Sequence, residues 1–227
     1  MNTPVISPAA KPTVTAHSGA FNTPDNSLEF VRKALAENCD ILEIDVTFRP
    51  SGKPVIIHKG MPDENEGVPL EDVFRLIAAH PAIRMNLDLK SIANLPAIDA
   101  LLREYGLFDR AFFTGVEETG AAAVKAGSKV PYYLNADISF GERRGRRLAD
   151  ALAKRLISLG AVGLNVHYGS VTPTVVRAMH ENGLPVSLWT ANTKKAMRRC
   201  IALGADNITT RHPDVLWPLL NETEGKV

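Results

Sequence analysis

The chain has 227 residues, and its 26 lysines and arginines nearly balance its 25 aspartates and glutamates. So small a net charge gives no bulk attraction to nucleic acid or to an anionic membrane surface, and neither is expected as a partner. The length suits one domain of α/β-barrel size or two small ones. The composition is ordinary for a folded globular protein.

Cysteine usage and the first residues bear on the compartment. Cys39 and Cys200 are the two cysteines of the sequence, which is too few for a disulfide framework and favours a reducing compartment. Residues 1–19 lack a basic region followed by an apolar core, and no run has the length of a membrane span. We therefore expect a cytoplasmic protein of unknown oligomeric state.

Short β-branched runs alternate with amphipathic segments from the first strand to the last. The expected strands are residues 13–17, 41–49, 84–90, 111–115, 130–136, 161–167, 185–191 and 207–210. The clearest helical patterns between them are residues 27–38, 69–80, 147–160, 174–183 and 193–204. Gly160, Gly183 and Gly204 stand where these helices end, a position that favours a left-handed residue.

Eight strands alternating with helices predict a single (β/α)8 barrel over residues 13–227, with residues 1–12 frayed. An open doubly wound sheet is the alternative. It is disfavoured because no glycine-rich phosphate loop follows the first expected strand.

The segment ILEIDVTFRP (residues 41–50) alternates apolar and acidic side chains. In a barrel strand such alternation points one set toward the helices and the other into the lumen. Leu42, Ile44 and Val46 would face the helices, and Glu43 and Asp45 would face the lumen. An exposed strand face with ion pairs is the other interpretation, but barrel strands are covered on both sides.

A turn signal at residues 50–53 predicts a short hairpin extension after this second strand. A four-residue loop would pair Thr47 with Ile56 and Asp45 with His58. That register would return His58 to the mouth of the barrel, although a slip of one residue would change the result.

The third expected strand repeats the pattern, with Asp88 and Lys90 on one face. Together Glu43, Asp45 and Asp88 form a cluster of oxygen donors that suits a hard cation such as Mg²⁺ or Ca²⁺. The first expected strand ends at His17. Two histidines beside such a cluster could act as general acid and general base near neutral pH.

The sequence resembles the glycerophosphodiester phosphodiesterases, which are metal-dependent (β/α)8 barrels. The matching segments are AHSG (16–19), NTPDNSLEF (22–30), EID (43–45), PVIIHKG (54–60), NLDLK (86–90), LWTAN (188–192) and GADNITTRHPD (204–214). The Asp-Leu-Lys triplet is also similar to that of the spider-venom phospholipase D barrels. The resemblance implies a phosphoric diester hydrolase acting in lipid metabolism on a small glycerophosphodiester or a related phosphodiester.

The resemblance also implies residue roles. His17 and His58 would be the catalytic pair, and Glu43, Asp45 and Asp88 would hold the metal. Lys90 would contact the phosphate or act as counter-ion to Asp88. Trp189 would line the pocket for the alcohol, unless it serves core packing.

Several positions depart from the family pattern. Ser18 stands where the family usually has arginine, Lys59 where it has aspartate, Asp88 where it has glutamate, and Arg211 where it has aspartate. The insertion after the second histidine is nearly absent. We expect Lys59 to replace part of the lost positive charge at the substrate phosphate, with Ser18 beside it.

Two other functions remain open from sequence. One is a non-catalytic barrel that keeps the metal and binds a phosphorylated ligand. The other is a phospholipase D-like lyase that releases a cyclic phosphate. His167 ends the sixth expected strand and could reach the mouth, but it is better explained as structural. His80, His180 and His212 fall at helix ends or in loops and carry no signal. The basic run at residues 142–155 is best explained as a solvated face with only a weak hint of anion binding.

Overall fold

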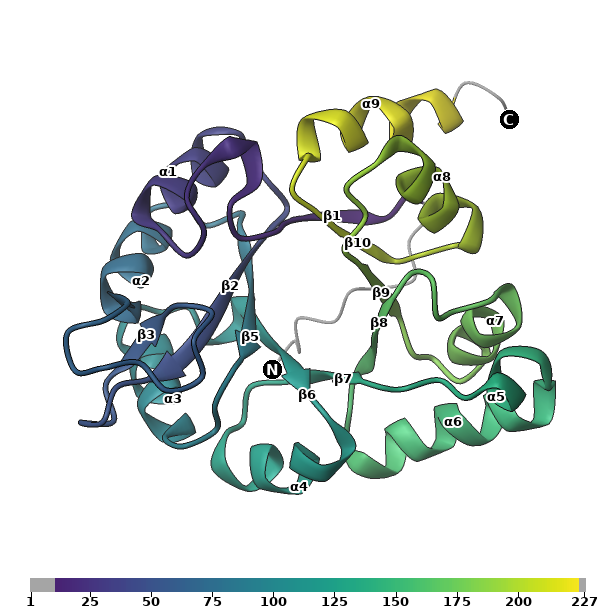
Figure 1. Ribbon diagram of the computed structural model, residues 1–227, viewed down its shortest axis with the longest axis horizontal. Coiled ribbons are helices and arrows are strands. Elements are labelled where there is room, and N and C mark those ends of the chain that lie inside the picture. Colours follow the sequence, from purple (N-terminus) through teal and green to yellow (C-terminus); the bar gives the residue numbers. More distant parts are fainter. Residues whose placement is uncertain (1–10, 225–227) are drawn as a thin grey trace.

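In the computed structural model, which describes residues 11–224, eight parallel strands close a barrel that helices surround (Figure 1). Around the barrel the strands run β1, β2, β5, β6, β7, β8, β9, β10 and back to β1. The predicted (β/α)8 barrel is therefore confirmed. The predicted fraying falls mostly on residues 1–10, which lie outside the described part of the chain.

The elements follow one another along the whole described chain. The barrel strands are β1 (Thr13–Ala16), β2 (Ile41–Phe48), β5 (Arg84–Leu89), β6 (Ala111–Val116), β7 (Tyr132–Asn135), β8 (Gly163–His167), β9 (Val186–Trp189) and β10 (Asn207–Thr210). The helices are α1 (Leu28–Ala36), α2 (Leu70–Ala78), α3 (Leu95–Glu104), α4 (Glu118–Gly127), α5 (Phe140–Arg144), α6 (Arg146–Leu159), α7 (Pro173–Glu181), α8 (Lys194–Leu203) and α9 (Pro213–Glu224), with short turns η1 (Ala20–Asn22) and η2 (Phe108–Arg110). None of the helices among these residues combines the length and apolar character of a membrane span.

Local signals set the helix limits as the sequence indicates. The Ser27 hydroxyl caps α1 by accepting a hydrogen bond from the Phe30 amide. Gly160 follows α6 with φ of 90°, and Gly204 follows α8 with φ of 78°. Glycine adopts this left-handed conformation at little cost because it has no Cβ.

A hairpin extends from the second barrel strand, as predicted, but its register differs by one residue. Strands β3 (Pro54–Ile56) and β4 (Val68–Pro69) pair antiparallel beyond β2. The observed partners are Thr47 with Val55 and Phe48 with Pro54, so the predicted pairing of Thr47 with Ile56 is wrong. The cause is a turn of three residues, 50–52, in place of the predicted four. The Arg49 amide donates to the Lys53 carbonyl, and Gly52, with φ of 82°, donates its amide to the Arg49 carbonyl.

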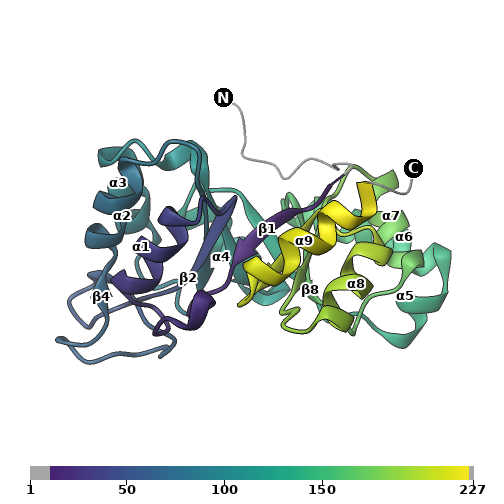
Figure 2. The same ribbon diagram turned by 90° about the horizontal axis from the view of Figure 1, so that it is seen from above.

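The strands separate two packed regions. Leu42, Ile44 and Val46 belong to the core between strands and helices, as the alternation predicts. Inside the barrel Ile41, Phe112 and Tyr133 form a second buried cluster, in which the two rings lie 5.1 Å apart. Ile41, Phe112 and Tyr133 fill the lower part of the lumen, so the polar side chains above them are accessible only from the mouth of the barrel. Figure 2 shows the barrel from the side, with the β2 hairpin and the α5 loop reaching the same end.

The opposite end of the barrel is closed by a buried carboxylate. Asp206 is 2% exposed, and its Oδ2 accepts hydrogen bonds from the Val186 amide and from Nε2 of His180, both at 2.7 Å. Its backbone carbonyl accepts from the Thr13 amide of the first strand. His180, which carries no signal in the sequence, is therefore part of the link that closes the barrel.

We expect His180→Ala to lower the free energy of unfolding by about 1–3 kcal/mol, because Asp206 keeps its burial and loses a partner. Denaturant unfolding would measure this. His80→Ala is the matched control, since the His80 side chain is exposed and should change stability by less than about 0.5 kcal/mol. Equal effects of the two substitutions would contradict the assigned role of His180.

Candidate active site

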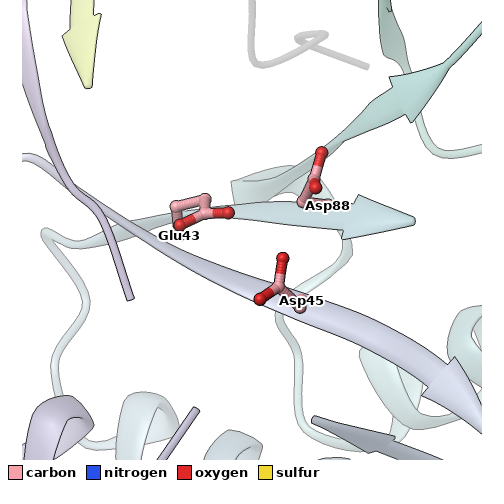
Figure 3. Close-up of side chains that lie close together, drawn as sticks. All are labelled: Glu43, Asp45 and Asp88. Carbon is pink, nitrogen blue, oxygen red and sulfur yellow. The ribbon is translucent and has the colours of Figure 1, made fainter. Parts of the chain in front are cut away.

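Three carboxylates meet at the mouth of the barrel. Glu43 and Asp45 come from β2 and Asp88 from the neighbouring β5, and the three side chains point toward a common space (Figure 3). One carboxylate oxygen of each lies within 4.8 Å of the others. The strand alternation and the pairing of Asp45 with Asp88 produce this arrangement. Three converging oxygen donors suit a hard divalent cation better than a soft one.

One cation of the protein already faces this cluster. The Lys90 ammonium lies 2.5 Å from Asp88 Oδ2 and 3.0 Å from Asp45 Oδ1. Burial alone would lower the pKa of Lys90, but the charges and hydrogen bonds of Asp88 and Asp45 raise it above its ordinary value. Lys90 therefore stays charged, yet a single ammonium faces three carboxyl groups.

Burial and the remaining negative charge of the cluster raise the pKa of Glu43. It is 5% exposed, and burial together with the nearby Asp88 and Asp45 raises its pKa to about 7, against the opposing charge of His17. Its Oε2 accepts a hydrogen bond from the Ser18 amide at 3.0 Å, which fixes the carboxyl group. A divalent cation would supply the missing positive charge here.

Asp45 is held in its ionised form by its neighbours. Burial would raise its pKa, but hydrogen bonds from Asn26 and His58 and the charge of Lys90 keep it below its ordinary value. The Asn26 side-chain amide donates a hydrogen bond to Asp45 Oδ2 at 2.7 Å. Its side-chain oxygen accepts a hydrogen bond from the Asp45 backbone amide at 2.9 Å. Asn26 lies in the quoted segment NTPDNSLEF, but its local sequence gives no sign of this contact.

Two histidines flank the carboxylates. His17 Nδ1 lies 2.8 Å from the Ser18 carbonyl, and His58 Nδ1 lies 3.1 Å from Asp45 Oδ2. Both acceptors can only accept, so Nδ1 donates in each ring and Nε2 is left free. His58 thus reaches Asp45 as predicted, although from beyond the strand and not through the predicted register. Its side chain is 79% exposed, whereas that of His17 is 24% exposed.

Other predicted residues take different positions. Trp189 lines the same cavity as the carboxylates, and its indole Nε1 is buried without a hydrogen-bond partner. The Ser18 hydroxyl is buried and accepts a hydrogen bond from the backbone amide of Asn26 at 2.6 Å. The Lys59 ammonium binds Glu66 at 2.6 Å, so the predicted phosphate contact would require it to leave this partner.

The cavity that these groups share has a volume of about 370 Å³. Its lining also contains polar residues that the sequence patterns do not single out. These are Thr114, Glu117, Asn135, Asn165 and Thr209, whereas Asn86, which also lines the cavity, shares the strand face of Asp88 and Lys90 in the segment NLDLK. Thr114 donates its hydroxyl toward Asp88 Oδ1 at 2.6 Å and so supports the cluster. Each lies on a strand or at its end, and only strand alternation within an assembled barrel could have indicated them.

The Glycerophosphoryl diester phosphodiesterase family profile matches residues 128–215. A glycerophosphodiester phosphodiesterase of Caldanaerobacter subterraneus subsp. tengcongensis is 25% identical, over 93% of this chain and 99% of the relative. A Silicibacter pomeroyi structure provisionally named for the same activity has a TM-score of 0.80 at 20% identity, covering 96% of both chains. An Oleispira antarctica phosphodiesterase in complex with its product sn-glycerol-3-phosphate has a TM-score of 0.71 at 19% identity, covering 93% of this chain and 97% of that one.

The fold and the site define a barrel of the phosphoric diester hydrolase class, with an acidic cluster at its mouth. The family resemblance predicted from the sequence is confirmed by these matches. The chain is thus similar to the glycerophosphodiester phosphodiesterase family in sequence over residues 128–215 and in fold over almost its whole length.

The raised pKa of Glu43 predicts a pH-dependent metal affinity. Only the carboxylate form binds a cation, so protons compete below the pKa of about 7. Titration calorimetry with Mg²⁺ should show roughly tenfold weaker binding at about pH 6 than at about pH 8. Glu43→Gln should bind more weakly at both values and lose most of this dependence. Equal affinity of the unchanged protein at both values would contradict the assignment.

Proposed function

We propose that the protein is a divalent-metal-dependent phosphodiesterase that cleaves a glycerophosphodiester or a closely related phosphodiester by acid–base catalysis with His17 and His58. Glu43, Asp45 and Asp88 would hold the metal, which we take to be Mg²⁺ or Ca²⁺ because all three donors are carboxylate oxygens. The activities named for its relatives support this substrate class.

One observation carries the proposal most directly. His17 and His58 both have Nδ1 engaged and Nε2 free, and both line one cavity with the carboxylate cluster. Within residues 11–224 no hydrogen bond engages Nε2 of either ring, so both atoms can exchange protons. Two such rings on one cavity provide a base and an acid for a single transfer.

The chemistry follows from these positions. One histidine removes the proton from a substrate hydroxyl adjacent to the phosphate, and that oxygen forms a bond to phosphorus. The bond from phosphorus to the leaving alcohol breaks, and the other histidine protonates the departing oxygen. The products are an alcohol and a cyclic phosphate. The latter is then opened by water in a hydrolase or released in a lyase.

When bound, the divalent cation would stabilise negative charge on the phosphoryl oxygens. Lys90 would assist, since its ammonium already lies between Asp45 and Asp88 and remains charged. Asn26 would keep Asp45 aligned, and Asp45 in turn orients the His58 ring. Trp189 would border the alcohol side of the substrate.

We also keep the cytoplasm as the proposed location. Cys39 and Cys200 are free and buried, and burial raises the pKa of each thiol to about 12. Such thiols have no disulfide role and agree with a reducing compartment.

His58→Ala should lower turnover by about 10²–10⁴-fold, the range for losing a positioned acid or base. Release of alcohol from a panel of glycerophosphodiesters would measure this. His80→Ala, far from the cavity, should keep its turnover within about twofold of the unchanged protein. Turnover by His58→Ala that equals that of the control would contradict the catalytic role.

Asp45→Asn should weaken metal binding by at least about tenfold while leaving the fold intact, since one of three charged donors is lost. Calorimetry gives the affinity, and circular dichroism gives the fold. Removing bound metal with a chelator should abolish turnover, and adding Mg²⁺ or Ca²⁺ should restore it. Full turnover after chelation would exclude metal dependence. Metal binding without any turnover on the panel would instead favour a non-catalytic phosphate-binding barrel.

A further inference from the structure

An ion pair joins the loop after the first barrel strand to the loop after the last. Asp25 lies between β1 and α1, and Arg211 directly follows β10, the strand beside β1 (Figure 1). The Arg211 guanidinium binds the Asp25 carboxylate through Nη1 at 2.7 Å and through Nη2 at 3.1 Å. Because a contact with two parallel bonds fixes direction as well as distance, it sets how these two loops lie against each other.

The backbone of Arg211 is itself anchored to the barrel. Its amide donates a hydrogen bond to Asn192 Oδ1 at 2.9 Å, and its carbonyl accepts one from the Phe21 amide at 3.2 Å. The carbonyl of the preceding residue, Thr210, accepts a hydrogen bond from the His17 amide at 2.9 Å. Arg211 is therefore a fixed point from which the ion pair can position the loop that contains Asp25.

The loop of residues 17–27 has a backbone conformation that costs free energy. Three of its residues have φ between 48° and 60°, in the left-handed region that residues other than glycine rarely adopt, namely Phe21, Asn22 and Asn26. Gly19 also has a positive φ, of 79°, and a Cβ there would overlap Asp25 Oδ1 and lie 2.7 Å from Arg211 Nη1. The ion pair thus packs directly on the Gly19 backbone and helps to hold a strained loop in place.

The same loop holds the two carboxylates of β2. The Ser18 amide donates a hydrogen bond to Glu43 Oε2 at 3.0 Å. The Asn26 side chain both donates to Asp45 and accepts from it. The Asn26 backbone amide donates to the Ser18 hydroxyl at 2.6 Å, so these contacts depend on one another. Asp25 directly precedes Asn26, and its ion pair therefore determines where the Asn26 side chain lies.

We propose that Asp25 and Arg211 are positioning residues for the metal centre. Their ion pair holds the loop of residues 17–27 so that Glu43 and Asp45 face one cation. This inference rests on the proposed function and adds to it two residues that do not line the cavity. The side chains of Asp25 and Arg211 are 54% and 37% exposed, so the pair contributes little to global stability. Its effect is local, on the carboxylates that the loop aligns.

The affinity for Mg²⁺ tests the inference, and the direction of the change is diagnostic. Arg211→Met should weaken Mg²⁺ binding about fivefold in titration calorimetry, the size expected of one partly exposed pair. A general charge effect has the opposite sign, because removing a cation near three carboxylates favours the metal. Arg211→Lys should recover only part of the loss, since an ammonium lacks the planar fork of arginine. Unchanged or tighter binding by Arg211→Met would overturn the inference.

A double-variant cycle shows whether the two residues act as a pair. Asp25→Asn should weaken Mg²⁺ binding by a similar factor, and Asp25→Asn combined with Arg211→Met should bind no more weakly than the weaker single variant. Arg146→Met is the matched control, because Arg146 also forms a two-bond pair at similar exposure, with Glu181, but joins α6 to α7. Additive losses in the double variant, or an equal loss in the control, would overturn the inference.

A measurement without metal or substrate separates failure of this inference from failure of the proposed function. The side-chain amide resonances of Asn26 are followed in the nitrogen-15-labelled protein, because they report its hydrogen bond to Asp45. Arg211→Met should shift these resonances and reduce their protection from hydrogen exchange, whereas Arg146→Met should change neither. If no Mg²⁺ binds and no diester is cleaved, this result still decides. Resonances that keep their position and protection in Arg211→Met would overturn the inference.

Discussion

The structure depends on the burial of carboxylates that the protein itself only partly neutralises. Glu43 and Asp45 are almost fully buried on one strand, and Asp88 lies beside them on the next. Lys90 is the ammonium that faces them, and the pKa of Glu43 is raised to about 7 as a result. Burying charge in this way is costly without a partner, so the cluster is best understood as part of a site completed by a cation.

The barrel makes this arrangement possible and also confines it. Side chains of Ile41, Phe112 and Tyr133 fill the lumen below the cluster, so the polar groups are reached from the mouth alone. Parallel strands bring their ends to one face, where loops can differ without disturbing the packed core.

Much of the cluster could be predicted from sequence because strand alternation is a local property. Assigning Glu43 and Asp45 to the lumen requires only the period of the strand, and Asp88 follows from the same pattern on the next barrel strand. His58 lies beside Asp45 as predicted, but for a different reason. The turn is one residue shorter than the predicted four, and His58 reaches Asp45 after the strand has ended.

Contacts between distant segments were beyond such patterns. Asn26 holds Asp45 from a loop, and Glu66 draws the Lys59 ammonium to itself; neither contact has a local signature. The sequence around His180 carries no signal, yet His180 contacts the buried Asp206 at the opposite end of the barrel.

The central claim is that Glu43, Asp45 and Asp88 jointly hold one divalent cation at the point where phosphate binds. Anomalous diffraction from crystals grown with Mn²⁺ and a slowly cleaved phosphodiester tests it most directly, because the ion is located by its own scattering. The account predicts one strong peak bounded by these three carboxylates, with a phosphoryl oxygen of the ligand beside it. A peak elsewhere, or an empty cluster with the ligand bound away from Lys90 and the histidines, would contradict it.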